Sequence, residues 1–440
     1  MKDGSRILLV RPAPGAEPYF PLGLASVAAV LLERRHAVWG ADLQFDTTET
    51  VVRLAQEHLC QWVGFSVLHH TVEQVGRVVK RLKQATAART FAIGSMPCLD
   101  PEKTLLSAGV DYAIQGDPEL AVAELLESDG GDRLPAGCAS LEGGIFRPPQ
   151  KRAVVELEGL PFADRSLFSR AQYSFGMRTT AQPAAAIFTS RGCDRSCPFC
   201  PVPSIRPAGF DARSVDGVYD EMERLVTNDR IACLLIEDDL FTADRSRVEE
   251  LCERLIAKPL PVFWELVNGV RPDSVDEDLL QHMAGAGCSR IVFGFEHLSR
   301  AMQSEVCSHP EKARRAVEAA RGCGLRVGGY FIVGIPGVDI AGALHGGLAA
   351  IRLGLDDANF MPYYDCPDTT WGLGARTPVI RRPWTVELAK VLQMAFLGKP
   401  RPMVRLVSDL LTESRGLPNL ASKARELMQY GGPVPLRDNP

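Results

Sequence analysis

The feature that most constrains the fold is an alternation of short apolar runs with helical patterns. In the first block, residues 5–125, a helical pattern at residues 22–35 follows the first apolar run. The strand candidates of this block are residues 7–10, 38–41, 62–67, 91–94 and 112–114. Strands that alternate with helices form a parallel sheet with helices packed on its faces. The sequence therefore predicts an α/β first domain, a Rossmann-like doubly wound parallel sheet, in residues 1–150.

The same alternation resumes after a break. A stretch rich in glycine and proline, residues 130–150, indicates the boundary, and residues 151–183 are predicted to be a linker. The strand candidates of the second block are residues 184–190, 232–236, 262–267, 290–295, 326–333 and 359–361. Helical patterns separate these six candidates, which predicts a second α/β domain in residues 184–370. A short helical region, residues 371–440, is expected to follow.

Three cysteines lie close together in a loop directly after the first strand candidate of the second domain. Cys193, Cys197 and Cys200 have the spacing C-x3-C-x2-C. Three thiolates can hold three irons of a cubane iron–sulfur cluster, which normally has four cysteine ligands. The fourth iron would then be open to a substrate or cofactor. A zinc site is the alternative, but it would need a fourth ligand, and no histidine is near in the sequence. An electron carrier, another alternative, usually ligates every iron with cysteine.

Composition limits the classes of partner. The net charge is −5, so no basic surface for nucleic acid is expected. No apolar run is long enough to cross a membrane, and the N-terminus lacks the apolar core of a signal peptide. The chain has 12 cysteines, and those outside the loop are scattered, as is usual for free thiols in a reducing compartment. These observations predict a cytoplasmic protein that binds neither nucleic acid nor a membrane.

The cysteine loop resembles the signature of the radical S-adenosylmethionine (radical SAM) superfamily, C-x3-C-x-aromatic-C, with Phe199 at the aromatic position. The resemblance implies a [4Fe–4S] cluster whose open iron chelates SAM. It implies that reduction of the cluster breaks a C–S bond of SAM and yields a 5′-deoxyadenosyl radical. An electron donor such as flavodoxin or ferredoxin, or a dedicated reductase, is then expected. The second domain is expected to be a partial (β/α)6 barrel of the TIM type, with reactive residues at the carboxyl ends of its strands.

Polar residues follow several of these strand candidates. Glu237 and Asp239 follow the second strand, Glu265 and Asn268 close the third, and Glu296 ends the fourth. The resemblance implies catalytic roles for Glu237, Asp239 and Glu296. It implies a SAM site formed by Phe199, Glu237, Glu296, Ile332 and Gly334. Acids at strand ends also cap helices, and glycines also permit tight packing, so both alternatives stay open. After the sixth strand, Asp368 stands where relatives often have glycine.

The first domain resembles the cobalamin-binding-type domain that precedes many radical SAM barrels. The matching pieces are residues 21–24, 66–68, 94–95 and 116–119, each at the end of a strand or the start of a helix. The resemblance implies that Ser66, Leu68, Gly94 and Ser95 line a cobalamin site. The D-x-H-x-x-G loop that ligates cobalt in some members is absent, and residues 42–46 stand in its place. A domain that binds no cobalamin and serves as a scaffold is the alternative.

Two reactions are compatible with this layout. The layout is similar to that of the radical SAM diol dehydratases of aminoglycoside pathways, which favours radical dehydration or rearrangement of a small, polar, sugar-like metabolite in antibiotic biosynthesis. The alternative is a cobalamin-dependent radical SAM C-methyltransferase of natural-product biosynthesis. An alternative of another class is a non-catalytic iron–sulfur or zinc protein.

Overall fold

The computed structural model describes residues 4–13, 19–130, 133–152, 154–168, 173, 181–206, 209–298, 309–367, 369–372, 380, 382 and 384–397. The chain divides into two compact units. The first unit comprises residues 1–268, 285–289 and 366–378, and the second comprises residues 269–284, 290–365 and 379–440. Asp368 and the segment after residue 397 lie outside the described residues, so the expectations for them are not examined by the structure.

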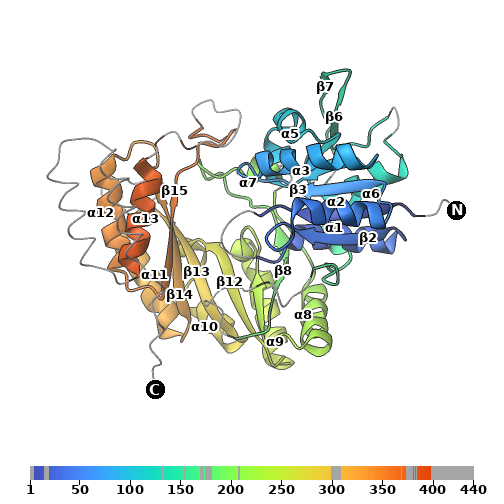
Figure 1. Cartoon of the computed structure of the whole chain (residues 1–440). Helices are drawn as coiled ribbons and strands as arrows, with labels where there is room; N and C mark the ends of the chain where they lie inside the picture. The colour runs from blue at the N-terminus through green and yellow to red at the C-terminus, as the bar shows by residue number, and fades with distance from the viewer. Residues whose placement is uncertain are drawn as a thin grey trace. The chain divides into compact units, whose positions relative to one another are not determined.

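The N-terminal domain is built on a parallel sheet whose five strands match the five predicted from the sequence. They are β1 (Arg6–Arg11), β2 (Ala37–Asp42), β3 (Trp62–Ser66), β4 (Arg89–Ile93) and β5 (Tyr112–Ile114). Their order is β2-β1-β3-β4-β5, so the chain reverses direction across the sheet between β1 and β3 (Figure 1). In a doubly wound sheet, this switch point marks the carboxyl edge where ligands bind.

Helices cover both faces of this sheet (Figure 1). They are α1 (Leu22–Glu33), α2 (Thr48–Glu57), α3 (Val72–Ala85), α4 (Ser95–Leu99), α5 (Pro101–Ala108) and α6 (Pro118–Glu127). Alternate residues of a strand point to opposite faces. Accordingly, Ile7 and Leu9 of β1 pack with α1 and α6, whereas Leu8 and Val10 pack with α2, α3 and α5. The doubly wound sheet expected from the sequence is thus confirmed.

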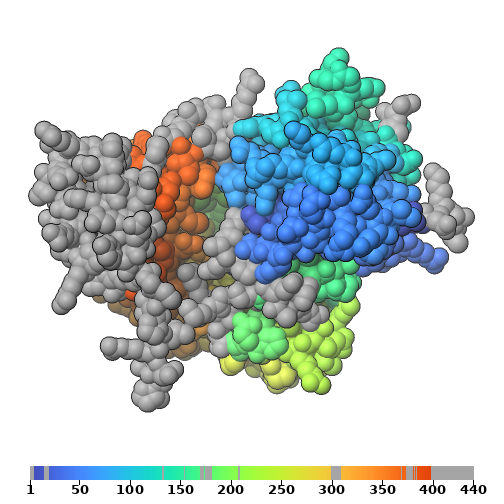
Figure 2. Space-filling view, viewed as in Figure 1, coloured from blue at the N-terminus to red at the C-terminus, as the bar shows by residue number. Residues whose placement is uncertain are grey.

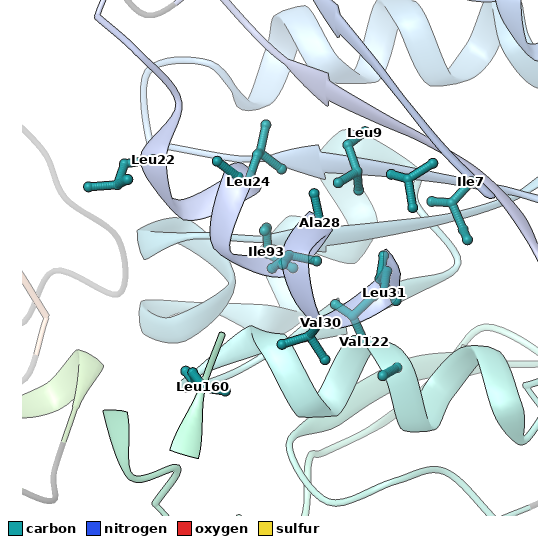
Figure 3. Packing of buried hydrophobic residues seen from close by; sticks show 14 of the residues in the cluster. Ile7, Leu9, Leu22, Leu24, Ala28, Val30, Leu31, Ile93, Val122 and Leu160 are labelled. Carbon is teal, nitrogen blue, oxygen red and sulfur yellow. The ribbon is translucent and has the colours of Figure 1, made fainter. Parts of the chain in front are cut away.

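The core beneath α1 shows why this helix forms where the apolar pattern begins. Its residues Leu24, Ala28 and Leu31 recur at helical spacing and meet the β1 side chains Ile7 and Leu9 (Figure 3). All five side chains are fully or almost fully buried. Burial of a leucine or isoleucine side chain contributes about 1.5–3 kcal/mol. The helix is therefore stabilised mainly by its packing against the sheet.

The glycine- and proline-rich stretch expected to mark the domain boundary contains two further strands. β6 (Cys138–Glu142) pairs antiparallel with β5, and β7 (Ile145–Arg147) pairs antiparallel with β6. Gly143 and Gly144, with φ of 56° and 83°, form the two-residue turn between them. Positive φ at both central positions is what such a hairpin requires, and glycine supplies it. The hairpin extends the sheet and protrudes from the first unit (Figures 1 and 2).

The second sheet contains the six strands predicted for the barrel. They are β8 (Ala184–Ile187), β11 (Cys233–Ile236), β12 (Phe263–Val270), β13 (Cys288–Glu296), β14 (Arg326–Val333) and β15 (Asp357–Pro362). Their order in the sheet, β15-β14-β13-β12-β11-β8, follows their order in the chain. β8 pairs parallel with β11, β11 with β12, β13 with β14, and β14 with β15. Within the described residues β8 and β15 are edges, so the barrel is partial, as expected.

Helices follow these strands along the chain. They are α8 (Val215–Asp229), α9 (Arg245–Ala257), α10 (Glu277–Gly285), α11 (Pro310–Gly322), α12 (Ile340–Ile351) and α13 (Trp384–Phe396). α13 confirms a helix within the region predicted to be helical after the barrel. In the part of the chain that the structure describes, none of the helices has the length and apolar character needed to cross a bilayer.

One prediction about a strand end is wrong. β12 continues to Val270, three residues past the predicted end, so Glu265 lies inside the strand and is fully buried. The continuation passes through Gly269, where an added Cβ would lie 3.1 Å from the Cα of Gly294. A residue without a side chain lets the two backbones approach closely. Cys233 donates from its Sγ to Glu265 Oε1 at 3.6 Å, which places this acid in a buried structural contact.

Candidate functional site

The three cysteines of the motif lie in one loop, residues 192–205, called here the cysteine loop. Cys193, Cys197 and Cys200 are all half-buried, and the Cys200 amide donates to the Cys197 carbonyl at 3.0 Å. The pKa of Cys200 is raised to about 12, mainly by burial, and the sulfurs of Cys197 and Cys193 act in the same direction. Three thiols near enough to repel one another as thiolates suit a cationic metal group that compensates their charge.

The donor set fits a cubane better than a single zinc ion. Within the described ranges, no three His, Cys, Asp or Glu side chains converge as ligands of one metal ion. A structural zinc ion needs four ligands at one point. In a cubane, each cysteine binds a different iron, so the sulfurs need not converge. The loop therefore fits three corners of an iron–sulfur cluster.

Two acids after β11 accept hydrogen bonds from the residues at the start of the cysteine loop and directly before it. Asp238 is buried and accepts hydrogen bonds from the Thr189 amide at 2.7 Å and from Ser190 Oγ at 2.6 Å, and the Thr189 hydroxyl also donates to it. Asp239 accepts from the Gly192 amide at 2.7 Å. Neither acid is a helix cap, since Asp244 caps α9. The contact that Asp239 makes is with the loop backbone, and its catalytic role stays a prediction.

Glu237, the third acid of this run, has a different environment. Its side chain is half-buried at the carboxyl end of β11, and burial raises its pKa to about 7, an effect that the charge of Arg165 opposes. A carboxyl group with a pKa near neutrality can exchange a proton under ordinary conditions. The structure thus supplies an acid of the kind expected at a reactive site.

Glu296 ends β13 in the second unit and has an unusual backbone. Its φ is +57°, and the pairing of β13 with β14 is irregular between Gly294 and Glu296. A non-glycine residue in the left-handed region is uncommon, and such strain is concentrated at functional sites. Burial raises the pKa of Glu296 to about 7, and the nearby Arg271 opposes the shift. The bulge turns the glutamate out of the regular strand.

The fifth-strand residues predicted for SAM have mixed surroundings. Ile332 is half-buried near the end of β14. Gly334 follows with φ +82°, and an added Cβ there would lie 2.2 Å from the methyl group of Thr385 at the start of α13. Packing against α13 therefore requires glycine at this position. The tight-packing alternative explains Gly334, and a role for it in binding SAM stays a prediction.

An aromatic contact covers the cysteine loop, and no sequence pattern predicts it. The ring of Trp371 lies 6.1 Å from the ring of Phe199, at an angle of 40°. The Trp371 amide donates to the Pro198 carbonyl at 2.8 Å. Residues 369–372 follow the sixth strand by several positions, and no spacing or motif links them to the cysteines. Only the tertiary fold could reveal this contact.

The four residues predicted for cobalamin meet at the carboxyl edge of the N-terminal sheet. Ser66 ends β3, Leu68 follows it, and Gly94 and Ser95 lie between β4 and α4. Gly94 has φ +106°, and an added Cβ would lie 2.9 Å from the Val67 carbonyl and 3.5 Å from Ser66 Oγ. The two loops thus touch, and a side chain at Gly94 would separate them. This edge also contains the switch point of the sheet.

The stretch in place of the histidine loop has a structural role. Asp42 forms a buried ion pair with Arg11 at 2.9 Å and accepts a hydrogen bond from the Tyr173 hydroxyl at 2.7 Å. Asp42 also accepts from the Gln44 amide, and Asp46 accepts from the Asp42 amide, both at 2.8 Å. These bonds hold the turn at the end of β2. No histidine lies in this stretch to serve as a cobalt ligand.

Comparison with protein families matches both halves of the chain. The model of the radical SAM superfamily matches residues 187–343, and the model of the B12 binding domain matches residues 14–126. The first match contains the cysteine loop and the strands β11 to β14, and the second contains β2 to β5 with their connecting helices.

Comparison with curated proteins finds relatives of low identity. An uncharacterized methyltransferase of Pyrococcus horikoshii is 22% identical over 329 residues, which cover 72% of this chain and 70% of the relative. Cytidylyl-2-hydroxyethylphosphonate methyltransferase of Streptomyces wedmorensis is 28% identical over 51% of this chain and 41% of the relative. The anaerobic magnesium-protoporphyrin IX monomethyl ester cyclase of Rubrivivax gelatinosus is 28% identical over 62% of this chain and 51% of the relative.

Two solved structures share the fold. One is the radical S-adenosylmethionine methyltransferase TsrM of Kitasatospora setae with cobalamin and a [4Fe–4S] cluster bound, with a TM-score of 0.70, 19% identity and coverage of 84% of this chain and 77% of that chain. The other is the cobalamin-dependent S-adenosylmethionine radical enzyme OxsB with aqua-cobalamin bound, with a TM-score of 0.72, 14% identity and coverage of 97% and 71%. At these identities the likeness establishes the fold.

Proposed function

The chain carries a B12-binding domain followed by a radical SAM domain, and from this premise we propose that it is a cobalamin-dependent radical SAM methyltransferase. The observation that carries the proposal is the presence of two separately built sites in one chain. The cysteine loop carries the three cysteines that we assign to the cluster, and the loops of Ser66 and Gly94 meet at the carboxyl edge of the N-terminal sheet, where we place cobalamin. A chain that used only the cluster would not require the second site.

Methyl transfer is better supported than the dehydration that the sequence favoured. Two of the relatives are named as methyltransferases, and so is TsrM, whose structure contains both cobalamin and the cluster. The cyclase of Rubrivivax gelatinosus shows that related chains also carry out other reactions. The substrate that we propose is a small, polar metabolite of a natural-product pathway, and the methyl acceptor is one of its carbons.

We assign the following roles to the residues of the chain. Cys193, Cys197 and Cys200 would hold the cluster, and Glu296 and Glu237 would bind polar groups of SAM or substrate. When bound, the cluster with SAM supplies a radical that removes hydrogen from carbon, and cobalamin supplies the methyl group. The protein orients the substrate and excludes water. A reduced electron carrier and a cytoplasmic location belong to the same proposal.

The test is a cofactor assay on full-length protein handled without oxygen. The protein is reconstituted with iron, sulfide and hydroxocobalamin, desalted, and analysed for iron, cobalt and its ultraviolet–visible spectrum. We expect about four irons and one cobalt for each chain. Four irons without cobalt would contradict the methyltransferase proposal and favour radical dehydration instead.

Glu296→Gln is expected to weaken SAM binding roughly 10- to 100-fold, because a charge-assisted hydrogen bond to the ammonium group would be lost. Protonation removes the negative charge of the wild-type carboxyl group as the pH falls through about 7. Wild-type affinity for SAM should therefore be lower at about pH 6 than at about pH 8, and the variant should lose part of this dependence. Equilibrium binding to reconstituted protein measures both effects.

The matched control for this measurement is Glu318→Gln. Glu318 is an exposed residue of α11 that pairs with Arg314. Its replacement should leave the SAM affinity and its pH dependence unchanged. Equal affinities of wild type and Glu296→Gln at both pH values would show that Glu296 does not bind SAM.

A further inference from the structure

The residue that precedes the cysteine loop is anchored in the N-terminal domain. Arg191 belongs to the short strand β9 (Ser190–Arg191) and places its Nη2 atom 2.7 Å from Glu119 Oε1. Glu119 lies in the first turn of α6 and also accepts a hydrogen bond from Ser26 Oγ at 2.7 Å. The side chains of Glu119 and Arg191 are 1% and 13% exposed. The pair is therefore a buried ion pair, and the N-terminal domain supplies its acid.

The residue that follows the cysteine loop is held in the same way. Arg206 comes directly after α7 (Val202–Ile205), and its Nε donates to Asp117 Oδ2 at 3.2 Å. Its Nη1 donates to the Arg191 carbonyl at 2.8 Å, which closes the two ends of the loop on each other. Asp117 also lies 3.9 Å from Arg191 Nη1. The arginines at both ends of the cysteine loop thus contact two acids that lie after β5, and Arg206 also pairs with Asp211 at 3.2 Å.

Asp117 ends a loop that contacts the predicted cobalamin site, and Glu119 lies in the helix that follows it. Gly116, next to Asp117, donates from its amide to Cys98 Sγ at 3.3 Å, and Gln115 Nε2 donates to the Cys98 carbonyl at 2.8 Å. Cys98 is a buried residue of α4, the helix that begins after Gly94. α4 also packs against α7 of the cysteine loop. A continuous set of contacts therefore runs from Gly94 to both ends of the cysteine loop.

We propose that Asp117 and Glu119 are positioning residues that couple the two cofactor sites. In this proposal, which rests on the proposed function, an assembled cluster orders the cysteine loop, and Arg191 and Arg206 transmit that order to the loops after β4 and β5. A second ligand then meets loops that are already ordered and binds more tightly. Linkage requires that cobalamin favour cluster assembly by the same factor.

The experiment measures the dissociation constant of hydroxocobalamin for full-length protein, with and without the reconstituted cluster. In the wild type, the cluster should tighten binding at least about fivefold. In the double variant Arg191→Met/Glu119→Leu, the ratio of the dissociation constant without the cluster to that with the cluster should fall close to one, while both cofactors still bind. Apolar replacement of both members of a buried ion pair usually preserves folding, whereas removal of one member leaves an unpaired buried charge.

The chain offers a matched control on the same helix, α6. Arg34, which follows α1, pairs with Glu127 of α6 at 2.8 Å, but this pair is exposed. Arg34→Met/Glu127→Leu should therefore keep the wild-type ratio. Asp117→Asn provides a second, milder variant, because it removes one of the two carboxylate charges beside Arg206 and leaves the other, Asp211 at 3.2 Å, in place. Its ratio should lie below that of the wild type.

The outcomes separate the two proposals. A wild-type protein that binds cluster and cobalamin with no effect of one on the other overturns the coupling and leaves the proposed function standing. A ratio that persists unchanged in both Arg191→Met/Glu119→Leu and Asp117→Asn overturns the role of these residues. A wild-type protein that binds no cobalamin overturns the proposed function, and the coupling fails with it.

Discussion

Cys197→Ala is expected to abolish cluster assembly and, with it, SAM binding and all activity. A cubane held by three cysteines loses a corner when one is removed, and no other cysteine belongs to the cysteine loop. Iron content after anaerobic reconstitution should fall from about four atoms for each chain to background. The reduced variant should also lack the electron paramagnetic resonance signal of the cluster.

A suitable control is Cys323→Ala. Cys323 is likewise half-exposed, but it follows α11 and donates to the Glu277 carbonyl at 3.8 Å. This variant should retain the full iron content. The cluster-free Cys197→Ala protein should unfold in urea within about 1 kcal/mol of cluster-free wild type, since a half-exposed side chain contributes little to packing. Full iron content in Cys197→Ala would show that this cysteine is not a ligand.

The fold was predictable because its signals are local and repetitive. Each predicted strand, from residues 7–10 to residues 359–361, combines a short apolar run with a following helical pattern. Strands of a parallel sheet are buried on both faces and therefore consist of apolar runs. An apolar run in the sequence thus predicts both the strand and its burial. The hairpin of β6 and β7 was missed because its strands are short and Gly143 and Gly144 resemble a linker. An antiparallel edge strand has no such apolar run.

The site was predictable only where chemistry is concentrated in a short segment. The spacing of Cys193, Cys197 and Cys200 needs no tertiary information. The ion pair of Arg191 with Glu119 joins residues far apart in the sequence. Glu119 belongs to one of the matching pieces, residues 116–119, but nothing in that piece indicates a contact with Arg191. The residue type does not show whether an arginine is buried or exposed, so only the packing of the folded chain reveals this ion pair. The same holds for Trp371, which reaches Phe199 from beyond the last strand.

The backbone at the start of the cysteine loop leads to the second large prediction. Gly192 has φ +77°, and an added Cβ would lie 2.0 Å from the Gly209 carbonyl oxygen. Gly192→Ala therefore combines an unfavourable φ with a clash against backbone, which together cost about 2–5 kcal/mol. The strain can be relieved only by displacing the loop next to Cys193. We expect this variant to lose most of its cluster although its cysteines are intact.

Gly209→Ala separates the two causes. Gly209 has the same φ of +77°, but an added Cβ would have no neighbour within 4 Å. This variant carries only the cost of the left-handed backbone, about 1–2 kcal/mol, and should still bind close to the wild-type amount of iron. Iron content and cluster spectra of the two variants, compared at equal helix content by circular dichroism, provide the measurement. If both variants retain the cluster, the close approach of Gly192 to Gly209 is not needed for the loop to hold it. If only Gly192→Ala loses it, the close packing beside Cys193 is what aligns the first ligand with the other two.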